Sequence, residues 1–272
     1  MENKVRLLLV QNSSVLNNPA ENFKNIQNLL KPYKDIPADL IVFPEVWASG
    51  WDCKNFVNIA EDSESSEIIK FLSEIAIEFS SNVIGGTYIK KNADGSLTNT
   101  CPVFDRDGKL IAQYDKMHLF SHFGCKEDNF IKRGNKPVIA DTDVASLGLS
   151  ICYDLRFPEL YRAYAFKGAD IFVNVAAWPQ VRKNHWLVLQ KARALENQSF
   201  VIAVSQAGQI KGDSYNLGYS MVISPNGDIL AQLYEEEGVL DFEINLEDML
   251  SLRKNFPVLN DRAQNYDISE VE

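Results

Sequence analysis

Short apolar runs alternate along this chain with longer stretches in which apolar residues recur every three or four positions. Runs such as Leu40–Phe43 are continuously apolar and rich in β-branched residues, which is typical of strands buried on both faces. This pattern predicts strands at Val5–Gln11, Leu40–Phe43, Asn82–Tyr88, Cys101–Asp105, Lys109–Tyr114, Leu147–Cys152, Ile171–Val175, Phe200–Ser205, Gly218–Ser224, Ile229–Leu233 and Gly238–Phe242. The helical spacing predicts helices at Pro19–Leu30, Ser65–Phe79, Phe157–Lys167, Asn184–Gln198 and Leu246–Lys254.

Two turn signals join neighbouring strands as hairpins, namely Asp107-Gly108 and Asn226-Gly227. Strands connected both by hairpins and through helices predict a mixed sheet or two sheets. The 272 residues contain no linker and no repeat, so residues 1–272 are predicted to form a single α/β domain. The polar segment after Asn255 is predicted to lie on the surface or against a partner subunit.

The chain is acidic, with a formal net charge of −10 and a sequence pI near 4.9. Such a charge repels phosphate backbones, so nucleic acid is not an expected partner. An acidic surface can still surround a locally cationic pocket for a small anion.

The four cysteines, Cys53, Cys101, Cys125 and Cys152, are scattered and have no metal-site spacing. In a chain of this size, the pattern favours reduced thiols in a cytosolic enzyme. The N-terminal apolar run is too short for a signal peptide, and no stretch is long enough to cross a bilayer. The sequence therefore predicts a cytoplasmic protein with no membrane association.

Three reactive side chains follow predicted strands, where ligand sites of α/β sheets are commonly built. Glu45 follows Leu40–Phe43 and a proline, so its carboxylate would be partly desolvated and suited to act as a base. Lys116 lies among apolar side chains, where its charge could stabilise an oxyanion. Cys152 lies between a strand and a helix, in a turn that would expose its sulfur beside backbone N–H groups.

Each of the three residues also has a plainer interpretation. Glu45 could begin a helix or lie on the surface, Lys116 could extend its amine into solvent, and Cys152 could be a buried core thiol. If the three meet, Glu45 would deprotonate the thiol, whose pKa is ordinarily about 8.5. Lys116 and a backbone N–H would then hold the oxyanion of a tetrahedral intermediate, and the route needs no metal and no organic cofactor.

The three segments together resemble the nitrilase, or carbon–nitrogen hydrolase, superfamily, whose members carry a Glu–Lys–Cys triad in this chain order. The matching motifs are FPE at 43–45, YDKMHLF at 114–120 and CYDLRFPE at 152–159. Further matches are ARALENQ at 192–198, Gly218 through Gly227, and Arg253 with Pro257. The resemblance implies a four-layer α-β-β-α sandwich with two mixed central sheets flanked by helices. It also implies subunit pairing through helices near the cysteine, in a homodimer or a higher homo-oligomer.

The resemblance further implies a second glutamate that supports the lysine. Glu127 is the best match, and Asp128 is the competing candidate.

The motif at 176–186, which contains Ala177, Trp178, Arg182 and His185, resembles the omega-amidase branch of the family. This branch hydrolyses the terminal amide of short dicarboxylate monoamides such as 2-oxoglutaramate. Pocket positions are therefore expected for Ala177, Trp178, Phe120 and Tyr153, the last through its backbone N–H. Arg156 could meet a substrate carboxylate, but an ion pair with Glu159 across one helical turn is the preferred interpretation.

Other functions are compatible with the same residues. Within the family, an N-carbamoyl amine hydrolase, an aliphatic amidase or a nitrilase would use the same thiolate. A papain-type hydrolase would instead need His118, His122 or His185 as its base, and a catalytically silent binding module is the non-enzymatic alternative.

Overall fold

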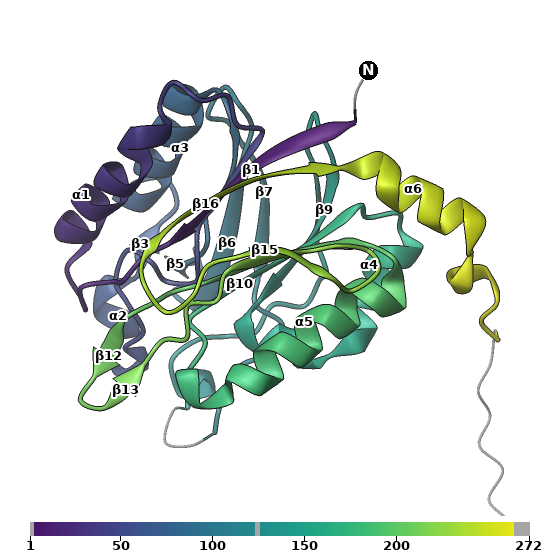
Figure 1. Ribbon diagram of the computed structural model, residues 1–272. Coiled ribbons are helices and arrows are strands. Elements are labelled where there is room, and N and C mark those ends of the chain that lie inside the picture. The colour runs from purple at the N-terminus through teal and green to yellow at the C-terminus, as the bar shows by residue number, and fades with distance from the viewer. Residues whose placement is uncertain (1–2, 123–125, 264–272) are drawn as a thin grey trace, which may run out of the picture.

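The computed structural model describes residues 3–122 and 126–263, and two central sheets dominate it (Figure 1). The first sheet has eight strands, in the order β16 (Gly238–Asn245), β1 (Lys4–Gln11), β2 (Leu40–Val42), β4 (Asn82–Ile84), β6 (Leu97–Phe104), β5 (Tyr88–Lys91) and β3 (Glu61–Asp62), with β7 (Leu110–Asp115) paired to β6. The second has six, in the order β15 (Ile229–Gln232), β14 (Met221–Ile223), β11 (Phe200–Ser205), β10 (Ile171–Ala176), β9 (Ser146–Ile151) and β8 (Ile139–Asp141). Both sheets mix parallel and antiparallel pairs.

Helices cover the outer face of each sheet, which makes four layers (Figure 1). The first sheet carries α1 (Pro19–Leu30) and α3 (Glu67–Phe79), and the second carries α4 (Pro158–Phe166) and α5 (Lys183–Asn197). The short α2 (Phe56–Ile59) and the hairpin of β12 (Gln209–Lys211) and β13 (Ser214–Tyr215) lie at one end of the molecule, and α6 (Leu246–Asn255) follows β16 at the other (Figure 1). The expected four-layer α-β-β-α sandwich is confirmed.

Strand β1 shows how the apolar pattern produces these layers. Successive side chains of a strand point to opposite faces of the sheet. Leu7 and Leu9 belong to the core between the two sheets, whereas Leu8 and Val10 belong to the core beneath α1 and α3. A continuously apolar strand is therefore buried on both faces, as the sequence pattern indicated.

Several predicted strands are wrong in their extent, and β6, for example, begins at Leu97 rather than at Cys101. The run Asn82–Tyr88 is divided into β4 and β5, because Gly86 has a φ of +60° and turns the chain against the Glu45 loop. The run Gly218–Ser224 is strand only at Met221–Ile223, because Gly218 and Tyr219 both have positive φ. Strand β8 and the β12–β13 hairpin had no recognisable apolar period and were not predicted.

The segment after α6 packs on the surface as far as it is described. The amide of Gln198 donates a hydrogen bond of 2.7 Å to the backbone oxygen of Phe256, and Leu259 packs against the central core. The rest of the predicted tail, residues 264–272, lies outside the described residues. No helix in the described ranges is both long enough and apolar enough to cross a membrane.

Candidate active site

Glu45 is held at the carboxyl end of β2 by its backbone neighbours. The backbone N–H of Val46 donates to the hydroxyl of Thr87 at 2.9 Å, and Gln206 donates to the backbone oxygen of Glu45 at 2.6 Å. Val46 has a φ of 44°, a conformation that a β-branched residue rarely adopts. This turn directs the carboxylate of Glu45 into the interior, where it is fully buried.

Lys116 follows β7 and lies between two carboxylates. Its Nζ is 2.9 Å from Oε1 of Glu45 and 3.1 Å from both carboxylate oxygens of Glu127. All three side chains are fully buried. Burial alone would lower the pKa of Lys116, but the negative charges of Glu127 and Glu45 outweigh it and hold that pKa well above its ordinary value. The ammonium group is therefore charged, which is what an oxyanion partner requires.

Glu127 opens a short 3-10 helix, Glu127–Asn129, and is the second glutamate that the structure brings to Lys116. Its Oε2 accepts a hydrogen bond of 2.7 Å from the backbone N–H of Phe120. Burial raises the pKa of Glu127, and Lys116 offsets part of that effect. Asp128, the competing candidate, is exposed and bonded to Ser121 instead.

Cys152 lies directly after β9, at the start of the 3-10 helix Cys152–Arg156. Its φ is 48°, so the nucleophile candidate adopts a strained left-handed conformation, as residues at functional turns often do. Burial and the nearby Glu45 carboxylate raise the pKa of the Cys152 thiol well above its ordinary value. The thiol is therefore protonated at rest, and the nearby carboxylate of Glu45, the base that the sequence predicted, contributes to its raised pKa.

A buried aspartate joins the lysine segment to the cysteine turn. Asp154 accepts hydrogen bonds from the hydroxyl of Tyr114 at 2.7 Å and from the backbone N–H of His118 at 3.0 Å. The imidazole Nδ1 of His118 lies 2.7 Å from the same carboxylate. Tyr114 and His118, which lie two positions before and two positions after Lys116, thus both contact Asp154, which lies two positions after Cys152. His118 serves this contact and does not contact the thiol as a papain-type base would.

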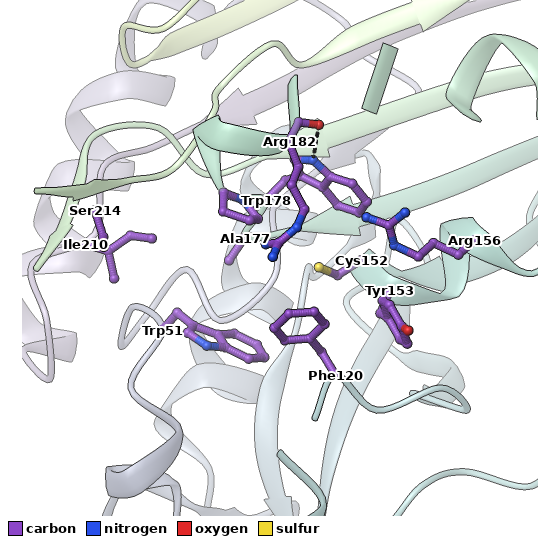
Figure 2. A pocket seen from close by; sticks show the side chains of 11 residues that line it. Trp51, Phe120, Cys152, Tyr153, Arg156, Ala177, Trp178, Arg182, Ile210 and Ser214 are labelled. Carbon is purple, nitrogen blue, oxygen red and sulfur yellow. Dashed lines mark hydrogen bonds between the residues drawn. The ribbon is translucent and has the colours of Figure 1, made fainter. Parts of the chain in front are cut away.

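A pocket with a volume of about 270 Å³ opens in front of the cysteine. Figure 2 shows the sulfur of Cys152 pointing into the space that Trp51, Phe120 and Arg182 surround. Of the four buried reactive side chains, Cys152 alone lines this pocket. The lining residues are Trp51, Phe120, Cys152, Tyr153, Arg156, Ala177, Trp178, Pro179, Arg182, Ile210 and Ser214.

The four pocket positions expected from the sequence, Phe120, Tyr153, Ala177 and Trp178, all lie in this lining. The backbone N–H of Ala177 also donates to Oε2 of Glu45 at 2.9 Å. Sequence reasoning missed Trp51, whose ring lies 5.0 Å from Nζ of Lys116. An aromatic residue six positions after Glu45 was the one feature of the sequence that could have indicated a place in the pocket.

The preferred ion pair of Arg156 with Glu159 is wrong. The guanidinium of Arg156 lies 5.2 Å from the ring centroid of Trp178 and 3.1 Å from Nδ1 of His185. The 3-10 helix that starts at Cys152 directs Arg156 towards the pocket, because Phe157 interrupts the helix before Glu159 with extended backbone. Arg182 reaches the same pocket and lies over the ring of Phe120 at 5.5 Å. Two guanidinium groups thus line a pocket in an acidic protein.

Within the described ranges, no group of three or more histidine, cysteine, aspartate or glutamate side chains is arranged to hold a metal ion.

Comparisons with known proteins identify the family of the chain. The family model described as carbon–nitrogen hydrolase matches residues 6–254. A 2-oxoglutaramate amidase from Paenarthrobacter nicotinovorans is 40% identical over 232 residues, which are 83% of this chain and 78% of the relative. An omega-amidase from Bos taurus is 33% identical over 275 residues, which are 99% of this chain and 97% of the relative.

A solved structure extends the likeness to three dimensions. A carbon–nitrogen hydrolase superfamily protein from Xanthomonas campestris, with an arsenic adduct in its active site, has a TM-score of 0.89 and 28% identity. The match covers 98% of this chain and 99% of that one. The expected resemblance to the superfamily and to omega-amidases is confirmed. The chain belongs to the carbon–nitrogen hydrolase family and is a hydrolase of carbon–nitrogen bonds other than peptide bonds.

Proposed function

We propose that the protein is an omega-amidase, which releases ammonia from the terminal amide of a short dicarboxylate monoamide such as 2-oxoglutaramate. The observation that carries this proposal is the placement of Arg156 and Arg182 in the pocket that ends at Cys152. A carboxylate at one end of the substrate would pair with a guanidinium, and the amide at the other end would reach the sulfur. The names of the two relatives described above support the same substrate class.

Acylation would begin with the neutral thiol of Cys152. Glu45 takes the thiol proton as the sulfur attacks the amide carbon, and the carbonyl oxygen becomes an oxyanion. Lys116 and the backbone N–H of Tyr153 would stabilise this oxyanion by hydrogen bonds. When the intermediate collapses, Glu45 returns the proton to the amide nitrogen, ammonia leaves, and a thioester to Cys152 remains.

In deacylation Glu45 would again act first as a base, on water, and then as an acid, on the sulfur. Glu45 removes a proton from water, the hydroxide attacks the thioester carbon, and Lys116 again faces the oxyanion. Collapse breaks the carbon–sulfur bond, and Glu45 returns its proton to the sulfur. The products are the dicarboxylic acid and the free thiol. Glu127 would keep Lys116 in place, because it contacts the ammonium through both of its oxygens.

Ammonia release from a panel of compounds tests the substrate class. The panel would compare 2-oxoglutaramate with aliphatic amides, N-carbamoyl amines and nitriles on one preparation. The proposal predicts a clear preference for 2-oxoglutaramate, and a higher kcat/KM for any other class would overturn it. Such a result would favour one of the alternative activities instead.

Replacement of Arg156 tests the recognition element. We expect Arg156→Gln to lower kcat/KM for 2-oxoglutaramate about a hundredfold, because the charge-assisted hydrogen bond to the substrate carboxylate is lost. A neutral aliphatic amide should be affected much less. Arg162→Gln is the matched control, because Arg162 lies outside the pocket and bonds to the backbone of Glu196. Equal losses on both substrates would contradict the role of Arg156.

We also propose that the enzyme acts in the cytoplasm. Cys101 and Cys152 are free thiols, which suits a reducing compartment.

A further inference from the structure

Asn99 is a buried residue in contact with both glutamates of the site. Its Nδ2 donates to Oε1 of Glu45 at 2.8 Å and to Oε1 of Glu127 at 3.4 Å. The side chain is fully buried. Because both neighbours are acceptors, only the NH2 group of the amide can face them, which fixes its orientation.

The position of Asn99 follows from strand alternation. On β6, residues 99, 101 and 103 point to one face, and Cys101 and Val103 belong to the core between the sheets. Thr100 points to the other face and donates to Asp115. The backbone oxygen of Asn99 accepts a hydrogen bond of 2.9 Å from the backbone N–H of Lys116. One strand residue therefore fixes both the lysine backbone and the two carboxylates that face the ammonium group.

The two oxygens of Glu45 have different partners. Oε1 accepts hydrogen bonds from Nζ of Lys116 and from Asn99, which occupy both of its lone pairs. Oε2 accepts a hydrogen bond from the backbone N–H of Ala177 and keeps a lone pair for another donor. The oxygen that remains open to a proton is therefore Oε2.

We propose that Asn99 is a positioning residue that directs the proton of Cys152 to Oε2 of Glu45 and stabilises both glutamates in their charged form. This inference rests on the proposed role of Glu45 as the base. Asn99 does not line the substrate pocket, so it acts through Glu45 and Glu127. The Oδ1 atom of Asn99 has no hydrogen-bond partner among the described residues. Burial of an unsatisfied acceptor is unfavourable, and the contacts of Nδ2 with the carboxylates offset it.

The pH dependence of Cys152 alkylation tests this inference without any substrate. Iodoacetamide would be applied from about pH 5 to about pH 9, and mass spectrometry would follow each cysteine separately. A hydrogen bond to the charged form of a carboxylate disfavours its protonation. Asn99→Ala removes this donor from Glu45, so the acid limb of the Cys152 alkylation profile should rise by about one pH unit.

A second variant and a matched control separate positioning from folding. Asn99→Asp keeps the size of the side chain and adds a third carboxylate, so its acid limb should rise further than that of Asn99→Ala. Asn82→Ala is the control, because Asn82 is also a buried asparagine with an unpartnered Oδ1. It bonds to Asp39 and Asp143 outside the site, so it should lower stability and leave the alkylation profile unchanged.

Steady-state kinetics provide a second readout. In Asn99→Ala we expect the acid limb of kcat to rise by the same interval of pH, with KM changed less than about twofold, because the pocket lining is intact. The inference is wrong if a folded Asn99 variant keeps the wild-type acid limb, whatever its stability. Glu45→Gln separates failure of this inference from failure of the proposed base. If Glu45→Gln also leaves the alkylation profile unchanged, Glu45 is not the base.

Discussion

At the residue scale, the site depends on the carboxylate of Glu45. It contacts Lys116, Asn99 and the backbone N–H of Ala177, and its charge helps to raise the pKa of the Cys152 thiol. Because burial keeps that thiol protonated, the attacking thiolate has to be generated during the reaction. A carboxylate that accepts the proton is therefore required at this position.

Glu45→Gln should slow turnover by about a hundredfold to ten-thousandfold, because an amide cannot take the thiol proton. The measurement is the initial rate of ammonia release with 2-oxoglutaramate. Glu159→Gln is the control, because Glu159 is exposed in the first turn of α4 and should leave the rate unchanged. Near-normal turnover of Glu45→Gln would count against Glu45 as the base.

The sequence predicted the residues that follow strands better than those that lie within them. Glu45, Lys116 and Cys152 were identified because each belongs to a motif with a recognisable context, whereas Glu127 was matched through a looser alignment of its loop. Asn99 was missed, because its contacts join β6 to two residues from distant segments, and nothing local distinguishes it from an ordinary strand asparagine. Arg156 was misassigned because helical spacing to Glu159 was assumed across a turn that is not continuous helix.

At the scale of elements, the long helices were predicted almost to the residue. Their apolar faces are continuous, and polar residues mark their starts: the side chain of Asn18 caps α1 and that of Ser66 caps α3. Strand boundaries were less predictable where tertiary contacts decide them. The break between β4 and β5 is such a case, because it depends on the close approach of Gly86 to the loop that carries Glu45.

Gly86→Ala should destabilise the fold by at least about 2 kcal/mol. A Cβ atom at this position would lie 2.0 Å from the backbone oxygen of Pro44, and the φ of +60° adds strain. Gly95→Ala is the matched control: its φ is +79°, but a Cβ would meet nothing within 4 Å. We expect the control to lose only about 1–2 kcal/mol. Denaturant unfolding measures both, and equal losses would show that the contact with Pro44 has no effect.

At the scale of the whole molecule, we propose a homodimer formed through the outer face of α4 and α5. This face carries large exposed apolar side chains, among them Phe166, Val188 and Leu195. Val188 and Leu195 are seven residues apart and therefore lie on the same side of α5. Exposed apolar side chains gathered on one face are typical of protein–protein interfaces.

The double variant Val188→Glu with Leu195→Glu should convert the dimer to a monomer, because it places charges in an apolar interface. Sedimentation equilibrium should give twice the chain mass of 30.7 kDa for the wild type and the single mass for the variant. Circular dichroism would verify that the variant is folded. A wild-type protein that sediments as a monomer, or a variant that stays dimeric, would refute this assembly.

Turnover by Cys152→Ala is the most direct test of the whole account, which requires a covalent bond from this sulfur to the acyl group. The substitution removes only the sulfur at the inner end of the pocket, so the fold and the thermal transition should change little. Ammonia release from 2-oxoglutaramate should fall by at least about a thousandfold. A folded Cys152→Ala protein that still releases ammonia at a rate close to that of the wild type would contradict the account.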